Sequence, residues 1–232
     1  MRTIDYLDTN IKTSILNDVK AVAIYHSRHY KGKEAGFFGI PRQVFCYVDY
    51  LGQIAYGGKK KNTVNATTFI KEFFPDNYKK YAELLYSMWR HGTVHQYEPI
   101  SYYAHFQNER EILVVIRWLS NNSNKSRNRK DHLKIFSMED SNRGLYLVVN
   151  ICQLVDDLLI ALDNFVGKLK KDRSYAVACE NRIDRCGENR NYTEIENKII
   201  KPLVKEQIKL AWNSRVGDID AKGKVIKSTR SK

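Results

Sequence analysis

The feature of this sequence that most limits its fold is a set of apolar residues recurring at three- and four-residue spacing. One such stretch covers about residues 4–25, and the longest covers about residues 145–170. Side chains at this spacing share one face of an α-helix, and that face must be buried against another element. The apolar positions are Leu7, Ile11, Ile15, Val19 and Val22 in the first stretch, and Val148, Ile151, Leu154, Val155, Leu158, Leu159, Leu162, Phe165, Val166 and Leu169 in the second.

Other segments complete a mainly α fold. Helices are predicted at about residues 41–56, 65–74, 75–91 and 193–213, where Pro41 and Pro75 suit a first helical turn. Residues 173–190 are charged and weakly patterned, and no element is predicted there. Residues 101–106 and 111–119 are rich in β-branched and aromatic residues, and a strand is predicted at about 113–116. Another strand is predicted at about 133–138.

We interpret the strands as a small antiparallel β insertion at about residues 101–143 of a helical bundle. The insertion includes a polar, basic loop from Asn121 to Asp131. The domain organisation predicted from these patterns is a single helical domain over residues 1–216, followed by a basic tail over residues 217–232 that is expected to be disordered.

The formal net charge of +13 favours a polyanionic partner. Nucleic acid is the commonest polyanion in a cell, so we predict that the chain binds it, with a surface kept basic only for solubility as the alternative. Two basic segments are candidate RNA contacts, namely Lys59, Lys60 and Lys61 in one loop and Lys125, Arg127, Arg129 and Lys130 in another.

Several other classes of protein are disfavoured. No run approaches the about 20 apolar residues of a membrane span, and the N-terminus lacks the apolar core of a signal peptide, so we expect a cytoplasmic protein with no membrane partner. Cys46 and Cys152 are interpreted as small buried hydrophobes. Asp156 and Asp157 are interpreted as the solvated face of their helix, and no His lies near Cys179 and Cys186 in sequence, so no metal site and no cofactor are predicted.

The most informative segment joins the end of the helix at 75–91 to Pro99. It contains Arg90, His91, Gly92, His95 and Tyr97. On an uninterrupted helix, Arg90 and His95 would project about 140° apart. Gly92 can end or distort the helix, and we therefore predict that the two side chains converge on one pocket. Arg127 and His132 have the same spacing, but they lie in a polar loop without a helical scaffold.

The segment from Arg90 to His95 resembles the R-polar-x3-H motif of the HEPN superfamily. Members are helical bundles that usually form dimers, and many are metal-independent endoribonucleases of toxin–antitoxin and other defence systems. Tyr97 extends the likeness to the R-x4-H-x-Y pattern of HEPN toxins that are paired with nucleotidyltransferase antitoxins. In those toxins the tyrosine is adenylylated, so the resemblance implies a homodimer, an RNA substrate, such an antitoxin as partner, and Tyr97 as a modification site.

The chemistry of RNA cleavage explains these residue types. The 2′-hydroxyl can attack the adjacent phosphate if a proton acceptor, a proton donor and a cation are in place. His95 titrates near neutrality and can act as base or acid. Arg90 presents a planar fork of donors to phosphate oxygens. His91 would orient the site, and the products would be a 2′,3′-cyclic phosphate and a 5′-hydroxyl.

Two alternatives stay open. The chain can be a non-catalytic dimeric helical module that binds nucleic acid or a partner protein, or a regulator that binds a nucleotide. In the first case, Arg90 and His95 stabilise the dimer. The purely structural alternatives for these residues are a salt bridge of Arg90 with Glu83 or Glu98 and a hydrogen bond of His95 to a carbonyl at the helix end.

Overall fold

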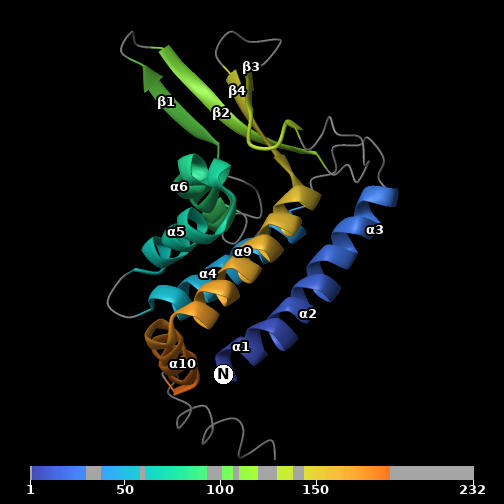
Figure 1. The fold of residues 1–232 in the computed structure, drawn as a ribbon. Helices are drawn as coiled ribbons and strands as arrows, with labels where there is room; N and C mark the ends of the chain where they lie inside the picture. The colour runs from blue at the N-terminus through green and yellow to red at the C-terminus, as the bar shows by residue number, and fades with distance from the viewer. Residues whose placement is uncertain are drawn as a thin grey trace, which may run out of the picture. The chain divides into compact units, whose positions relative to one another are not determined.

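A computed structural model of the chain describes residues 2–29, 38–57, 61–92, 101–106, 110–119, 130–137 and 144–188. The chain divides into two units, residues 1–184 and 185–232. The first is described below, and of the second only the end of one helix belongs to the described residues. Helices dominate, and four strands follow the segment from Arg90 to Pro99 (Figure 1). The prediction of a mainly α fold with a small β insertion is confirmed.

The N-terminal helix winds in an unusual way that matches its sequence. Its successive segments are α1 (Arg2–Tyr6), η1 (Leu7–Ile11), α2 (Lys12–Ser14), η2 (Ile15–Lys20) and α3 (Ala21–His29), of which η1 and η2 are π-helical. Its buried residues recur at every fourth position and are Leu7, Ile11, Ile15, Val19 and Ala23. A strict four-residue repeat drifts around an α-helix, which has about 3.6 residues per turn. The i→i+5 bonds of the π turns put more residues into each turn, so alternating turns keep the repeat on one face.

One predicted core position in this helix is wrong. Val22 is 41% exposed, and Ala23 is buried in its place. The predicted step from Val19 to Val22 was three residues, whereas the buried step is four residues, from Val19 to Ala23. The alternating α and π turns keep this four-residue repeat on the buried face.

Two adjacent core helices come next in the chain, α4 (Gly39–Tyr56) and α5 (Asn62–Phe73). They pack closely because Gly52 has no side chain. A Cβ atom on Gly52 would lie 2.9 Å from the backbone of Ala66. After Pro75 the chain forms η3 (Asp76–Tyr81), α6 (Ala82–Leu85) and the π-helical η4 (Tyr86–His91), which packs against α4 and α5.

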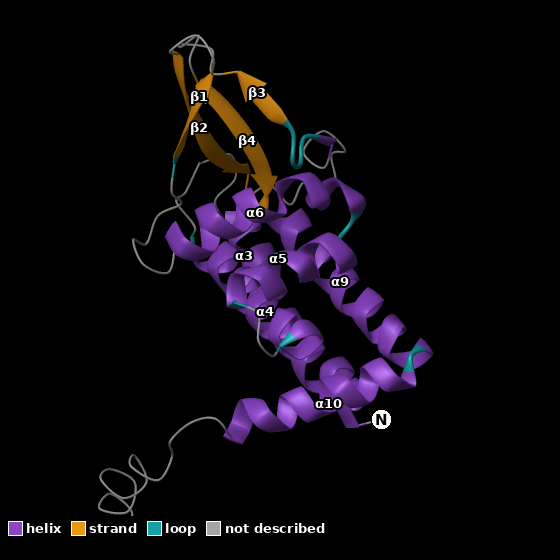
Figure 2. Ribbon diagram, turned by 90° about the vertical axis from the view of Figure 1, so that its left-hand side faces the viewer, coloured by secondary structure: helices purple, strands orange, loops and turns teal. Residues whose placement is uncertain are grey.

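The strands form one four-stranded sheet in the order β1-β2-β4-β3 (Figure 2). Their bounds are β1 (Tyr102–Phe106), β2 (Arg110–Leu119), β3 (Ile135–Ser137) and β4 (Gly144–Asn150). β1 pairs with β2 and β3 pairs with β4 in antiparallel orientation, as predicted. The central pair, β2 with β4, is parallel, so the prediction of a wholly antiparallel insertion is wrong in this respect. Long connections precede β4, which allows a parallel neighbour.

The helix α9 (Ile151–Lys171) starts later than its apolar pattern predicted. Residues 144–150 form β4, and the side chain of Asn150 caps the helix by accepting a hydrogen bond from the Gln153 N–H at 3.0 Å. The early start was predicted because a short apolar run fits a strand as well as a helix. A further helix, α10 (Arg173–Glu188), occupies the charged stretch for which no element was predicted.

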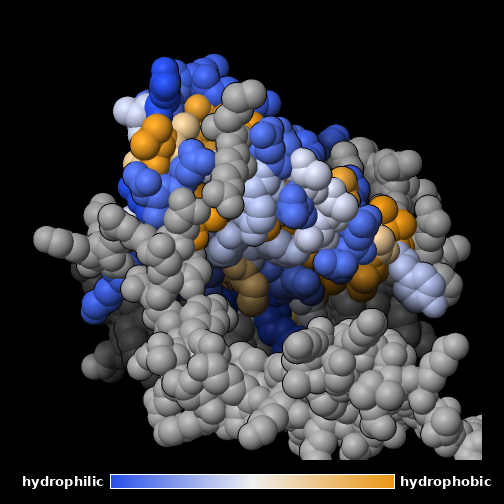
Figure 3. All heavy atoms as spheres, turned by 90° about the horizontal axis from the view of Figure 1, so that it is seen from below, coloured by the Kyte–Doolittle hydropathy of each residue, from blue (hydrophilic) through white to orange (hydrophobic). Residues whose placement is uncertain are grey.

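α9 lies at the centre of the helical core and contacts the N-terminal helix, α4, α5 and β4. Its predicted apolar face is buried throughout. Seen from below, the described surface is mainly hydrophilic, with smaller hydrophobic areas (Figure 3). None of the described helices has the length and apolarity needed to cross a membrane.

The contact between α4 and α5 generates a test with a matched control. Gly52→Ala should lower the free energy of unfolding by about 1–3 kcal/mol, because the new methyl group meets backbone that must shift. Gly167→Ala in α9 should raise it by about 0.5–1 kcal/mol, because nothing lies within 4 Å of that position and alanine favours a helix. Thermal and urea unfolding of the two variants measures both changes. Equal effects of the two substitutions would contradict the close packing at Gly52.

Candidate functional site

Arg90 is anchored to α4 by a carboxylate. It lies in η4, and its Nε atom donates a hydrogen bond to Asp49 Oδ2. The other carboxylate oxygen, Oδ1, accepts a hydrogen bond of 2.5 Å from the hydroxyl of Tyr86, four residues before Arg90. The Arg90 and Asp49 side chains are 26% and 20% exposed, so the pair lies at the edge of the core and is reached by solvent.

The charges of this cluster affect one another. Burial lowers the pKa of Arg90, but the hydrogen bond and the charge of Asp49 outweigh burial and raise that pKa above its usual value. Burial, followed by the hydrogen bond to Asp49, raises the pKa of Tyr86. The arginine therefore stays charged and the tyrosine stays neutral at every physiological pH.

Cys46 lies one turn before Asp49 on α4. It is exposed, so its interpretation as a buried hydrophobe is wrong. Partial burial still raises the pKa of its thiol, against the opposing effect of the positive charge of Arg90. The apolar neighbours of Cys46 in sequence face the core, whereas Cys46 itself lies on the polar side of α4.

The salt bridge predicted for Arg90 has a different partner. Asp49 takes the place of the predicted Glu83, which instead binds Lys71 in an ion pair. Glu98, the other predicted partner, lies outside the described residues. No local pattern indicates Asp49, because it is 41 positions away in sequence, on a helix that only the tertiary fold brings next to η4.

Gly92 itself has a helical conformation. This residue is buried and has right-handed helical angles, φ −62° and ψ −55°. The turn before it, from Tyr86 to His91, is π-helical. π turns are rare and occur mostly as single turns, frequently at functional sites. His95 and Tyr97, as well as the side chain of His91, lie outside the described residues, so the convergence of Arg90 and His95 stays a prediction.

Two of the predicted basic contacts belong to the described residues. Lys61 and Lys130 are both exposed. Lys59, Lys60, Lys125, Arg127 and Arg129 lie outside the described residues, as does the tail from residue 217. The segments outside the described residues also carry most of the excess of lysine and arginine over acidic residues.

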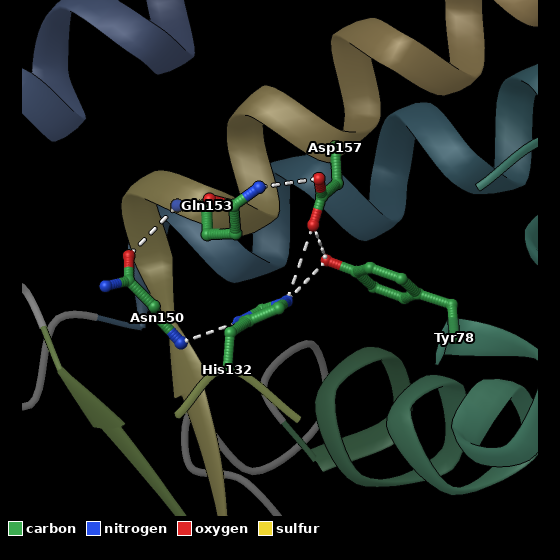
Figure 4. Close-up of polar contacts among 5 residues, drawn as sticks. All are labelled: Tyr78, His132, Asn150, Gln153 and Asp157. Atoms are coloured by element: carbon green, nitrogen blue, oxygen red, sulfur yellow. Dashed lines mark hydrogen bonds and ion pairs between the residues drawn. The ribbon is translucent and has the colours of Figure 1, made fainter. Parts of the chain in front are cut away.

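A second polar cluster is buried where the β insertion meets the helices (Figure 4). Tyr78 of η3 donates a hydrogen bond of 2.8 Å to Asp157 Oδ2 of α9, and its oxygen lies 2.8 Å from His132 Nε2. His132 is in the turn before β3, and its Nε2 lies 3.5 Å from the same carboxylate oxygen. Gln153 donates to Asp157 Oδ1 at 2.8 Å, and the backbone N–H of Asn150 donates to His132 Nδ1 at 3.0 Å.

These contacts define the protonation state of the histidine. Because Nδ1 accepts a hydrogen bond from a backbone N–H, the ring proton is on Nε2, where it can be donated to the Tyr78 oxygen. Burial lowers the pKa of His132 to about 4, and the ring is neutral at physiological pH. Burial and the charge of Asp157 raise the pKa of Tyr78, which keeps its proton for the carboxylate.

This cluster is buried and connects several elements. Tyr78, His132 and Asp157 are only 1%, 7% and 3% exposed. Leu133, next to His132, has a φ of 60°, which is costly for a branched side chain, and its N–H donates a hydrogen bond of 2.7 Å to Val148 of β4. The cluster therefore holds the turn before β3 against α9 and η3.

The prediction that Asp157 is solvated is wrong, because this residue is buried. Its position in the helical repeat indicates burial. Asp157 lies three residues after Leu154 and four before Ala161, both of which are buried, so it belongs to the apolar face of α9. Asp156 points outward and forms an ion pair of 3.1 Å with Lys20, as a solvated position should. For His132 no such periodic signal exists, because it lies in a turn between a polar loop and the strand that begins at Ile135.

No group of three or more His, Cys, Asp and Glu side chains suited to a metal ion occurs among the described residues. Cys179 is buried in α10, and the side chain of Cys186 lies outside the described part of the chain. Comparison with known proteins adds no relative, since no family model, curated protein or solved structure matches this chain.

The neutral, buried His132 predicts a specific dependence of stability on pH. Its pKa is about 4 in the folded chain and about 6.5 in the unfolded chain, so the unfolded state takes up a proton first as the pH falls. The stability contributed by the neutral ring is complete above pH 6.5 and is lost as the pH falls towards 4, by up to about 3 kcal/mol. Urea unfolding at a series of pH values measures this loss.

The control for this prediction is His132→Gln, which cannot titrate. The free energy of unfolding of the wild type should fall more steeply than that of the variant between about pH 6.5 and about pH 4. Curves that run parallel over that interval would show that His132 is not held neutral in the fold.

Proposed function

We propose that this protein is a HEPN-like, metal-independent endoribonuclease in which Arg90 and His95 act on one phosphate of RNA. The observation that carries the proposal is the state of Arg90. Its Nε edge is fixed by Asp49, its side chain is partly exposed, and it stands at the end of a π-helical turn directly before the segment that contains His95.

A guanidinium held by its Nε atom still has two terminal amino groups on its other edges. These groups form the planar fork that suits phosphate oxygens. Arg90 can then stabilise the negative charge that develops as the 2′-hydroxyl attacks. His95 supplies the proton acceptor for the 2′-hydroxyl and then the donor for the leaving 5′-oxygen, and His91 orients the site.

The partners and the setting belong to the same proposal. The net charge of +13 favours RNA as the polyanion, with the basic loops as further contacts. We propose a homodimer in the cytoplasm, acting as a toxin or defence protein, with Tyr97 as the residue that a nucleotidyltransferase antitoxin modifies. The resemblance of residues 90–97 to R-x4-H-x-Y supports these points.

The ion pair with Asp49 also favours a second candidate function. Many arginines at the edge of a core serve only to join two helices, and Arg90 joins η4 to α4. In that case the chain is a non-catalytic helical module that binds nucleic acid through its basic segments. Cleavage of RNA, as distinct from binding, separates the two functions.

The test is incubation of the purified protein with single-stranded RNA in EDTA. The wild type should produce fragments with a 2′,3′-cyclic phosphate and a 5′-hydroxyl. Arg90→Ala and His95→Ala should each lower the rate at least about a hundredfold, because each removes a group that acts in the transition state. Arg90→Lys should also be impaired, because an ammonium group keeps the charge but lacks the fork.

Arg173→Ala is the matched control, since it removes an exposed arginine at the start of α10 and should cleave at the wild-type rate. Thermal unfolding confirms that each variant is folded. If the wild type binds RNA without cleaving it, the non-catalytic module is correct. Cleavage that survives His95→Ala would exclude the mechanism proposed here.

A further inference from the structure

Both carboxylate oxygens of Asp49 accept a hydrogen bond. Oδ2 accepts the hydrogen bond from Arg90 Nε, and Oδ1 accepts the hydrogen bond from the Tyr86 hydroxyl. Both donors come from the same face of η4, four residues apart, whereas Asp49 belongs to α4. A carboxylate with one donor on each oxygen is fixed in rotation as well as in position.

We infer that Asp49 is a positioning residue for Arg90 in RNA cleavage and that Tyr86 holds Asp49 in place. This inference rests on the proposed function and assigns two further residues to it. Asp49 itself does not contact RNA in this arrangement, and acts only through the guanidinium that it orients.

The geometry explains why positioning is needed. An arginine side chain has several rotatable bonds, and a partly exposed one samples many orientations in water. A bond to Nε restrains the plane of the guanidinium and leaves the edge between the two terminal amino groups for another acceptor. The fork is then preorganised, and little conformational entropy is lost when a phosphate binds.

The surroundings make the pair rigid and strong. Asp49 lies in the middle of α4, where Val48 and Leu51 are fully buried, so its backbone cannot shift. Its side chain is 20% exposed, and the attraction between opposite charges is greater there than in bulk water. Burial and the hydrogen bond to Asp49 raise the pKa of the Tyr86 hydroxyl, so this group keeps its proton and can donate it to Asp49 Oδ1.

A positioning role and a purely structural role predict opposite effects when the negative charge is removed. Asp49 repels the phosphates of RNA, so Asp49→Asn makes the site more positive, and RNA binding should be unchanged or tighter. If Asp49 only joins two helices, cleavage should stay the same or increase together with binding. If Asp49 positions Arg90, kcat should fall even though KM does not rise.

The experiment measures kcat and KM for RNA cleavage by the full-length protein and by three variants. Asp49→Asn should lower kcat about ten- to hundredfold with KM unchanged or lower, because a misplaced catalytic group costs about that much. Tyr86→Phe changes no charge and should lower kcat severalfold at constant KM. Asp163→Asn is the control, because Asp163 is also a partly exposed aspartate that pairs with a lysine, Lys12, at 2.5 Å, and it should behave as wild type.

The possible results distinguish failure of this inference from failure of the proposed function. If the wild type cleaves RNA and Arg90→Ala does not, but folded Asp49→Asn and Tyr86→Phe keep the wild-type kcat, the positioning role is wrong and the proposed function stands. If the wild type does not cleave RNA, both are wrong. If Asp49→Asn does not fold, Tyr86→Phe decides alone, and a wild-type kcat in that variant overturns the inference.

Discussion

Burial of the apolar face of α9 is the constraint on which the rest of the structure depends. This helix contacts the N-terminal helix, α4, α5 and β4, so each of those elements buries its own apolar side against the same neighbour. The effect extends to the winding of the N-terminal helix. Its residues repeat every fourth position, and only a mixture of α and π turns keeps them on one buried face. Packing, more than local helix preference, therefore determines the geometry of that helix.

A buried polar cluster in such a core is favourable only if its members are paired. Tyr78, His132 and Asp157 meet this condition by bonding to one another, with Gln153 and the Asn150 backbone as further donors. Each of the three comes from a different part of the chain, which makes the cluster specific for one arrangement of the insertion. Apolar contacts alone would tolerate small shifts of the turn before β3 against α9, whereas these hydrogen bonds do not.

Arg90 and Asp49 are likewise paired with each other, but they lie at the edge of the core, where water can reach them. In the interior a charged pair would be satisfied and closed to ligands, as Asp157 is with its donors. At the edge, the bond to Nε fixes the arginine while its side chain stays partly exposed. One arginine can therefore form a stable ion pair and still bind a phosphate. The proposed ribonuclease function and the proposed positioning role of Asp49 both depend on this contact between Arg90 and Asp49.

The sequence by itself determined the mainly helical fold, the start of the β-rich insertion and nearly every buried apolar residue of α9. It did so because helical and strand periodicities are local, and burial follows the apolar face directly. Only the tertiary structure decided that β2 and β4 are parallel, that His132 meets Asp157, and that the partner of Arg90 is Asp49, 41 positions away. Such pairings depend on which elements the shared core brings together, and no spacing within a single segment encodes that. The R-x4-H-x-Y pattern is likewise local, so it indicates Arg90 as a candidate site residue but gives no information about Asp49, which holds Arg90 in place.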